Sequence, residues 1–141
     1  MINRELVIHK GAIIETYLKD LEGIIGSVSD EILLKNKQQL YAIERLLQLF
    51  VDTTVDINTY VITSNKFAPP DNNKGTFIIL GEQKVIPHDL AMRISESVGL
   101  RNAVVHRYEE VSHAFMLTKI RQFIPLYRDF LRKIIEYLTV R

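Results

Sequence analysis

The chain has 141 residues, no cysteine and a formal net charge of +1 at pH 7. This length is typical of one domain, and we expect residues 1–141 to form a single domain. The lack of cysteine excludes disulfide frameworks, a cysteine nucleophile and cysteine-ligated metal sites. The balanced charge excludes binding of nucleic acid through an overall basic field, so any such contact must be local or built across an oligomer.

The sequence carries no sign of a membrane or export segment. Charged residues interrupt the first ten positions, which lack an apolar core of signal-peptide length. No run approaches the roughly 20 apolar residues that a membrane-spanning helix needs. We therefore expect a cytoplasmic protein without a membrane anchor, and the absence of cysteine fits a reducing compartment.

Apolar residues recur at three- and four-residue steps over three long stretches, which predicts amphipathic helices. These helices should cover about residues 2–25, 38–63 and 112–138, and a short helix should lie over about 30–36. Pro125 should kink the last one because it removes a backbone donor. The stripes expected to be buried are Leu6, Ile13, Tyr17, Leu21 and Ile24; Leu40, Ile43, Leu47, Phe50, Val51, Thr54, Ile57 and Val61; and Ile120, Ile124, Tyr127, Leu131, Ile134 and Leu138.

The middle of the chain carries turn signals between shorter apolar segments. Residues 64–76 contain two adjacent prolines and several Asn, Asp and Gly residues, which predicts a loop. Phe77–Leu80 could be a strand, but no partner strand exists elsewhere, so we expect a helical turn packed on the bundle. Pro87 suits the first position of a helix over about 87–98, and Gly99 suits its end. The elements together predict an all-α fold, an up-and-down bundle of four to five helices.

One stretch combines residue types that phosphate chemistry uses. It reads Leu100-Arg101-Asn102-Ala103-Val104-Val105-His106-Arg107-Tyr108. Histidine titrates near neutral pH and acts as an acid or a base, and arginine grips phosphate oxygens through a planar fork. The alternative interpretation is a histidine satisfied inside a bundle and an arginine in an ordinary salt bridge.

The remaining histidines do not indicate a metal site. His9, His88 and His113 form no H-x-H or H-E-x-x-H pair. A Gly-rich phosphate loop and a serine nucleophile elbow are absent too. We therefore expect neither a metal nor a cofactor.

A polar row runs along the predicted helix over 38–63. Its members lie four residues apart and so share one face: Glu44, Gln48, Asp52 and Asp56. Two interpretations stay open at this point. The row is a solvated face, or its acidic end looks into a cleft.

The spacing of Arg101 and His106 sets a geometric condition. Five residues along an ideal helix correspond to a rotation of about 500°, so the two side chains lie about 140° apart. Either the helix is irregular here, or the two residues converge around a groove. A homodimer would also bring arginine and histidine side chains together, because a two-fold axis would place two copies of the motif in one cleft.

The run R-N-x-V-V-H-x-Y resembles the signature of HEPN-domain proteins, and within them that of the HepT-like toxins. The text of residues 42–58 resembles the second conserved helix of the same proteins. The likeness covers nearly the whole chain in element order, and the longer loop over 65–75 and the Phe77–Leu80 run are departures from the family pattern. It implies a HEPN-like helical bundle that forms a homodimer.

The resemblance also implies a function. HepT-like toxins are ribonucleases, so Arg101 and His106 would be catalytic in metal-independent RNA cleavage, with Asn102 and Asp56 in supporting roles. In these toxins the tyrosine matching Tyr108 receives AMP from an antitoxin, a nucleotidyltransferase of the MNT type. Added AMP would place charge and bulk beside the catalytic pair.

Two alternatives remain beside this interpretation. Tyr108 could be an amphipathic packing residue rather than a site of modification. The whole chain could be a non-catalytic helical partner of a nucleotidyltransferase that binds nucleotide or protein and cleaves nothing.

Overall fold

The computed structural model describes residues 2–106 and 111–140, and the regular structure of this part is helical throughout. The all-α prediction is confirmed, and one of the helices, α2, has only four residues. No helix within the described ranges combines the length and the apolar character that a membrane span requires. In chain order the helices are α1 (Arg4–Ile25), α2 (Asp30–Leu33), α3 (Lys37–Ser64), α4 (Asn73–Glu82), α5 (His88–His106) and α6 (His113–Thr139).

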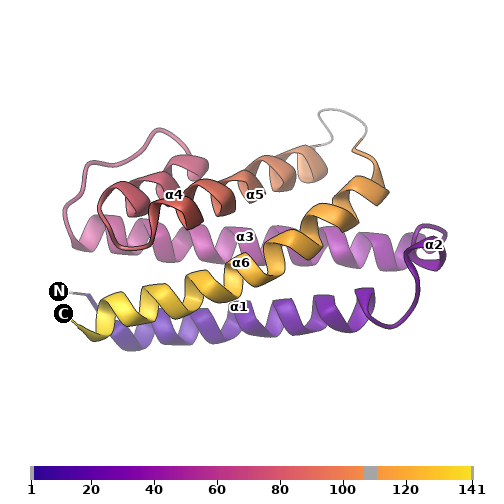
Figure 1. The fold of residues 1–141 in the computed structure, drawn as a ribbon, viewed down its shortest axis with the longest axis horizontal. Helices are drawn as coiled ribbons and strands as arrows, with labels where there is room; N and C mark the ends of the chain where they lie inside the picture. The colour runs from indigo at the N-terminus through magenta and orange to yellow at the C-terminus, as the bar shows by residue number, and fades with distance from the viewer. Residues whose placement is uncertain (1, 107–110, 141) are drawn as a thin grey trace.

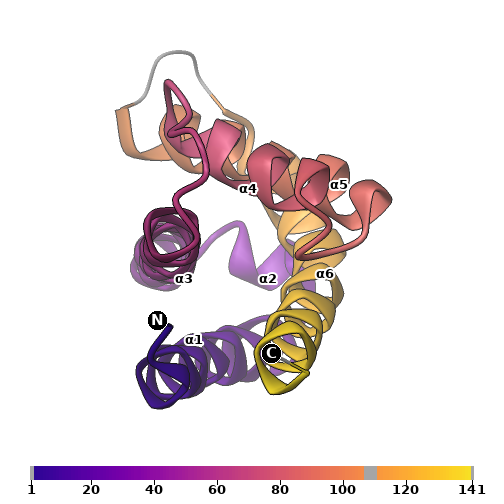
Figure 2. The same cartoon turned by 90° about the vertical axis from the view of Figure 1, so that its left-hand side faces the viewer.

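The long helices surround one apolar core. α1 and α3 lie side by side, α6 runs obliquely along them, and α4 and α5 form a pair beyond α3 (Figure 1). Viewed along the bundle, α1, α3, the α4–α5 pair and α6 form a ring in which each member packs against the next (Figure 2). The core is filled by side chains from all of them, so α5 is held on both α3 and α6.

Local capping explains where most helices begin. The residue before α1, α2, α3, α4 and α6 is an asparagine or a serine whose side chain accepts a first-turn backbone N–H. Asn72, for example, accepts from the backbone of Gly75 at 2.8 Å. Asn72, which belongs to the Asn-rich segment that predicted a loop over 64–76, thus caps α4. The connection between α3 and α4 spans only residues 65–72. Phe77–Leu80 lies inside α4, as the expected helical turn.

Of the predicted stripe of α1, Leu21 is buried, but its first three members lie one residue away from the inward row. Leu6 is 36% exposed, and Ile13 and Tyr17 are only half-buried. The inward row instead contains a glycine, Gly11, whose missing side chain makes the row hard to see in the sequence. A Cβ at this position would meet Leu131 of α6 at 3.5 Å, so α1 and α6 pack closely here. The buried row is Val7, Gly11, Ile14, Leu18 and Leu21.

The predicted end of α5 was also wrong, because the helix continues through Gly99 to His106. A glycine inside a helix costs about 1 kcal/mol relative to alanine, which packing readily offsets. Here α5 packs on α4 at Gly81, where a Cβ would meet the Cβ of Ala91 at 2.5 Å. This close approach requires glycine at position 81. The signature residues therefore extend a packed helix.

A buried hydrogen bond fixes α5 against α6. The hydroxyl of Tyr127 lies 2.6 Å from that of Ser97, and both residues are fully buried. Burial raises the pKa of the Tyr127 phenol, so it stays neutral and available as a donor. Its ring meets Phe50 of α3 edge-on at 4.7 Å between ring centroids. Arg101 lies one helical turn beyond Ser97, so its position relative to α3 is set by the core.

Candidate functional site

Arg101 forms a bidentate polar contact with α3. Its Nε and Nη2 donate to Oδ1 and Oδ2 of Asp52 on α3, each at 2.9 Å. The side chain of Arg101 is 17% exposed and that of Asp52 is 42% exposed. A bidentate pair of this kind fixes the plane of the guanidinium, so α3 orients the arginine that α5 carries.

The guanidinium keeps donors beyond those that Asp52 uses. Nη1 donates to Oδ1 of the neighbouring Asn102 at 3.4 Å, a long contact. Among the residues that the structure describes, Asp52 accepts two of the guanidinium N–H groups and Asn102 a third, so the rest remain available to an anion. Asn102 therefore touches the same cation, and its supporting role stays a prediction.

His106 is the last residue of α5 and is exposed. The helix is α-helical without a break from His88 to His106, so an irregular helix does not bring Arg101 and His106 together. The two side chains leave α5 about 140° apart. Convergence around a groove and a shared dimeric cleft are the interpretations that remain.

The polar row of α3 faces α5 over most of its length. Glu44 and Gln48 line a pocket of about 210 Å³ with Val104 and Val105, the residues between Arg101 and His106 in the sequence. Asp52 continues the row to Arg101. The row is thus partly covered at Glu44 and Gln48, whereas at its acidic end Asp52 pairs with Arg101 and Asp56 is exposed.

Asp56 differs from the rest of the row. It is exposed, one turn beyond Asp52, and the carboxylate against Arg101 is that of Asp52. A supporting role for Asp56 therefore stays a prediction without a contact to the motif. Tyr108 and its neighbours at 107–110 lie outside the described residues, so its predicted modification also stays a prediction.

Two further groups at this site were missed by the sequence reasoning. Arg45 lines the same pocket, is exposed, and donates from Nη1 to Oε1 of Gln48 at 2.9 Å. His113, at the start of α6, lies 3.1 Å from Glu44 between Nε2 and Oε2. The sequence signal for both was weak, because neither belongs to the motif and their partners depend on how the helices pack.

No group of three or more His, Asp or Glu side chains in residues 2–106 and 111–140 could hold a metal ion. The chemistry that the site offers in this part of the chain is that of a fixed cation with free N–H donors and a solvent-accessible imidazole on one helix. The cation can bind phosphate oxygens, and the imidazole can accept or donate a proton.

Comparisons with known proteins point to one family. The sequence profile of the family described as "Ribonuclease HepT-like" matches residues 14–134. A protein named "tRNA nuclease HepT" from Aphanizomenon flos-aquae is 32% identical over 126 residues, which cover 89% of this chain and 85% of the relative. A protein named "mRNA nuclease HepT" from Shewanella oneidensis is 22% identical over 130 residues, 90% of this chain and 94% of the relative.

Solved structures show the same fold. A tri-AMPylated HEPN toxin of Shewanella oneidensis, in complex with an MNT antitoxin, superimposes with a TM-score of 0.84 at 21% identity. The match covers 95% of this chain and 98% of the other. Because the family profile spans most of the sequence and a relative exceeds 30% identity over nearly its full length, the chain belongs to the HepT-like ribonuclease family.

Proposed function

We propose that this chain is the ribonuclease toxin of a toxin–antitoxin pair, which cleaves RNA without a metal and is silenced by a nucleotidyltransferase antitoxin of the MNT type. One observation carries the proposal. Asp52 binds one edge of the Arg101 guanidinium and leaves other N–H donors for a ligand, and the same helix ends in the exposed His106. The relatives named as tRNA and mRNA nucleases support the same reaction. An RNA substrate and such an antitoxin imply action in the cytoplasm.

The reaction follows from the two side chains. His106 removes the proton of a ribose 2′-OH, and the 2′ oxygen attacks the adjacent phosphorus while the bond to the 5′ oxygen breaks. The leaving 5′ oxygen takes up a proton, so the products are a 2′,3′-cyclic phosphate and a 5′-hydroxyl. Arg101 stabilises the negative charge on the non-bridging oxygens, a contribution of roughly 10²–10³ in rate for one such contact.

A homodimer completes the site in this proposal. Arg101 and His106 diverge on a regular α5, whereas a two-fold axis would pool two of each in one cleft. One histidine could then act as base while its counterpart acts as acid. Light scattering during size-exclusion chromatography should give about twice the chain mass, and a strict monomer at micromolar concentration would rule out the shared cleft.

The central experiment is RNA cleavage by the purified chain in EDTA. We expect cleavage to persist in the chelator and the product ends to be 2′,3′-cyclic phosphates. Loss of activity in EDTA with recovery in magnesium would contradict the mechanism. An intact protein that binds RNA or nucleotide and never cuts would instead favour the non-catalytic partner.

Regulation is proposed at Tyr108. A solved structure of similar fold is that of a tri-AMPylated HEPN toxin, which supports AMP transfer to this chain as well. Co-expression with a nucleotidyltransferase antitoxin should add one or more AMP groups and silence cleavage, because a phosphate ester repels substrate phosphate. Intact-mass spectrometry of wild type and Tyr108→Phe tests this, and an equal mass gain in both proteins would exclude Tyr108 as the acceptor.

A further inference from the structure

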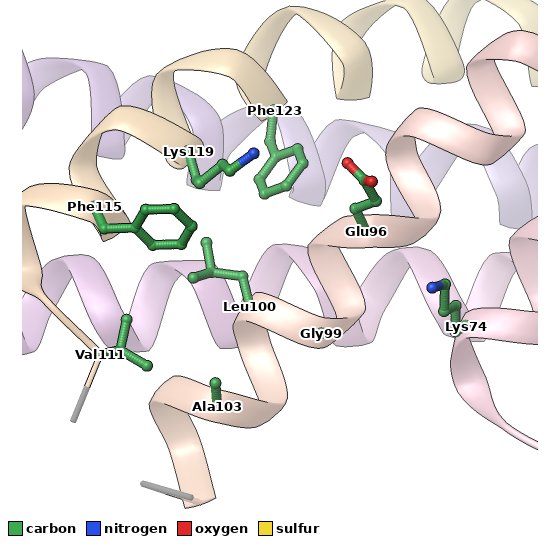
Figure 3. A pocket seen from close by; sticks show the side chains of 9 residues that line it. All are labelled: Lys74, Glu96, Gly99, Leu100, Ala103, Val111, Phe115, Lys119 and Phe123. Atoms are coloured by element: carbon green, nitrogen blue, oxygen red, sulfur yellow. The ribbon is translucent and has the colours of Figure 1, made fainter. Parts of the chain in front are cut away.

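A second concave site lies on the other side of α5 from Asp52. This groove has a volume of about 360 Å³ and runs between α5 and α6. Phe115, Lys119 and Phe123 project from α6 on one side, and Glu96, Leu100 and Ala103 belong to α5 on the other (Figure 3). Its size falls at the lower end of the range of small-ligand pockets, which suits one ring system and not a protein helix.

The groove presents an unusual exposed aromatic ring. Phe115 is 52% exposed, although it belongs to the helix that supplies much of the core. The ammonium of Lys119 lies 5.7 Å from the centre of this ring, within cation–π distance. An exposed aromatic face beside a cation is the combination on which single-stranded nucleic acids stack a base and fix a phosphate.

The charges around the groove fit the same ligand. Lys74 and Lys119 form no ion pair with any residue that the structure describes, so both ammonium groups remain for an anion. Glu96 is the acidic exception in the lining. A carboxylate accepts hydrogen bonds from the exocyclic amino group of a base such as adenine or cytosine, which uracil lacks.

The groove shares lining residues with a second hollow that reaches Asn102, the neighbour of Arg101. A neighbouring hollow of about 480 Å³ shares Lys74 and Gly99 with the groove and is lined on its far side by Asn102. Asn102 touches Arg101, which is assigned to the scissile phosphate. Lys74 and Gly99 thus lie between the surroundings of Arg101 and the groove that holds Phe115.

From these observations we propose that the α5–α6 groove binds a nucleobase of the RNA substrate that flanks the cleaved bond. The base stacks on Phe115 and its amino group donates to Glu96. The backbone phosphates on either side of that nucleotide contact Lys74 and Lys119. This inference rests on the proposed ribonuclease function and extends it to substrate preference, favouring bases with an exocyclic amino group.

Gly99 makes the groove testable without loss of the fold. It lies inside α5, where glycine is unfavourable, and a Cβ there would meet nothing within 4 Å. Gly99→Leu should therefore favour the helix while filling the groove. Gly23 in α1 is a matched control, because a Cβ at that position also meets nothing within 4 Å.

The experiment uses binding, so that it does not depend on cleavage. The chain has no tryptophan, and Phe115→Trp in a His106→Ala background supplies a single fluorophore in the groove. Oligoadenylate of five nucleotides should quench this fluorescence, and oligouridylate of the same length should bind about tenfold more weakly. Adding Gly99→Leu should abolish the quenching, whereas adding Gly23→Leu should leave it intact.

In a parallel anisotropy assay, Phe115→Ala should weaken oligoadenylate binding about tenfold, the loss typical of one stacked base.

Each remaining outcome decides between the two proposals. If wild type cleaves RNA and Gly99→Leu cleaves it equally fast with no quenching by either oligonucleotide, the base site is wrong and the ribonuclease stands. If quenching follows the prediction but wild type never cleaves, the base site stands and the ribonuclease falls. If Gly99→Leu leaves RNA binding unchanged and instead alters the oligomeric mass or antitoxin binding, the groove is a protein interface and the inference is overturned.

Discussion

Arg101 and Arg128 are both held by carboxylates from other helices, and they differ in what they leave free. Arg128 of α6 donates from Nε and Nη2 to Glu15 at 2.9–3.2 Å and from Nη1 and Nη2 to Glu22 at 2.7 Å. Arg101 of α5 has one carboxylate, Asp52, and a long contact to an amide.

The difference separates a structural cation from a reactive one. Two carboxylates surround Arg128, so the cluster carries net negative charge and repels phosphate. Arg101 with Asp52 is neutral as a pair and keeps N–H donors for a ligand. Arg128 thus joins α6 to α1, whereas Arg101 offers N–H donors to a ligand. The two arginines differ in the number of carboxylates that each one binds.

The largest expected effect is on activity at Arg101. Arg101→Lys keeps the charge but loses the fork, so RNA cleavage should fall roughly 10²–10³-fold with unchanged helical content. Arg128→Lys is the matched control and should cleave at the wild-type rate. Single-turnover cleavage rates decide the comparison, and a silent Arg101→Lys would make Arg101 structural like Arg128.

Removing the orienting carboxylate should have a smaller effect. Asp52→Asn leaves Arg101 in place but weakens its orientation, so we expect cleavage to fall roughly tenfold, the order seen when outer partners of reactive groups are removed. Asp56→Asn should change the rate less than twofold, because Asp56 is exposed and lies a turn away. The reverse ranking would show that the sequence-based choice of Asp56 was the better one.

At the structural cluster the effect should appear in stability instead. Arg128→Leu leaves Glu15 and Glu22 without their shared partner, and we expect the free energy of unfolding to fall by about 1 kcal/mol, because all three groups are partly exposed. Arg132→Leu removes only an exposed pair with Asp129 and should cost less. Urea denaturation measures both, and cleavage by folded Arg128→Leu should be unaffected.

The smallest effect is a pH dependence at the same cluster. The hydrogen bond from Arg128 lowers the pKa of the Glu22 carboxyl below its ordinary value of 4.5. A lowered pKa means stability that is present above pH 4.5 and lost as pH falls through the folded-state pKa. The stability difference between wild type and Glu22→Gln, well below 1 kcal/mol, should therefore be present at pH 7 and disappear below the folded-state pKa. A difference that grows on acidification would contradict the assignment.

Much of the fold was accessible from the sequence because it depends on local patterns. Every residue of the predicted stripes of α3 and α6 is buried, since long regular repeats leave one choice of inward face. In α1 the inward row includes Gly11, so an apolar count selected the neighbouring row as far as Tyr17 and met the buried row at Leu21. Gly99 was interpreted as a helix end from a local rule, although the burial of Leu100 and Val104 carries the helix onward.

The site, like the fold, has a part that local sequence patterns predict and a part that depends on how the helices pack. The motif marked Arg101 and His106, and the row on α3 was visible as a row. Which of its carboxylates meets Arg101 depends on the offset between α3 and α5 along their axes, and a shift of one turn exchanges Asp56 for Asp52. That offset is set by contacts such as those of Tyr127 with Ser97 and Phe50, which no local pattern encodes.

The most direct test of the account is the rate at which His106→Ala cleaves RNA in EDTA. His88→Ala is the matched control, because His88 is an exposed histidine at the opposite end of the same helix, about 27 Å away along its axis. We expect wild type and His88→Ala to cleave alike, whereas folded His106→Ala should have no measurable activity. Cleavage by His106→Ala at the wild-type rate would contradict the central claim that this imidazole moves the proton in RNA cleavage.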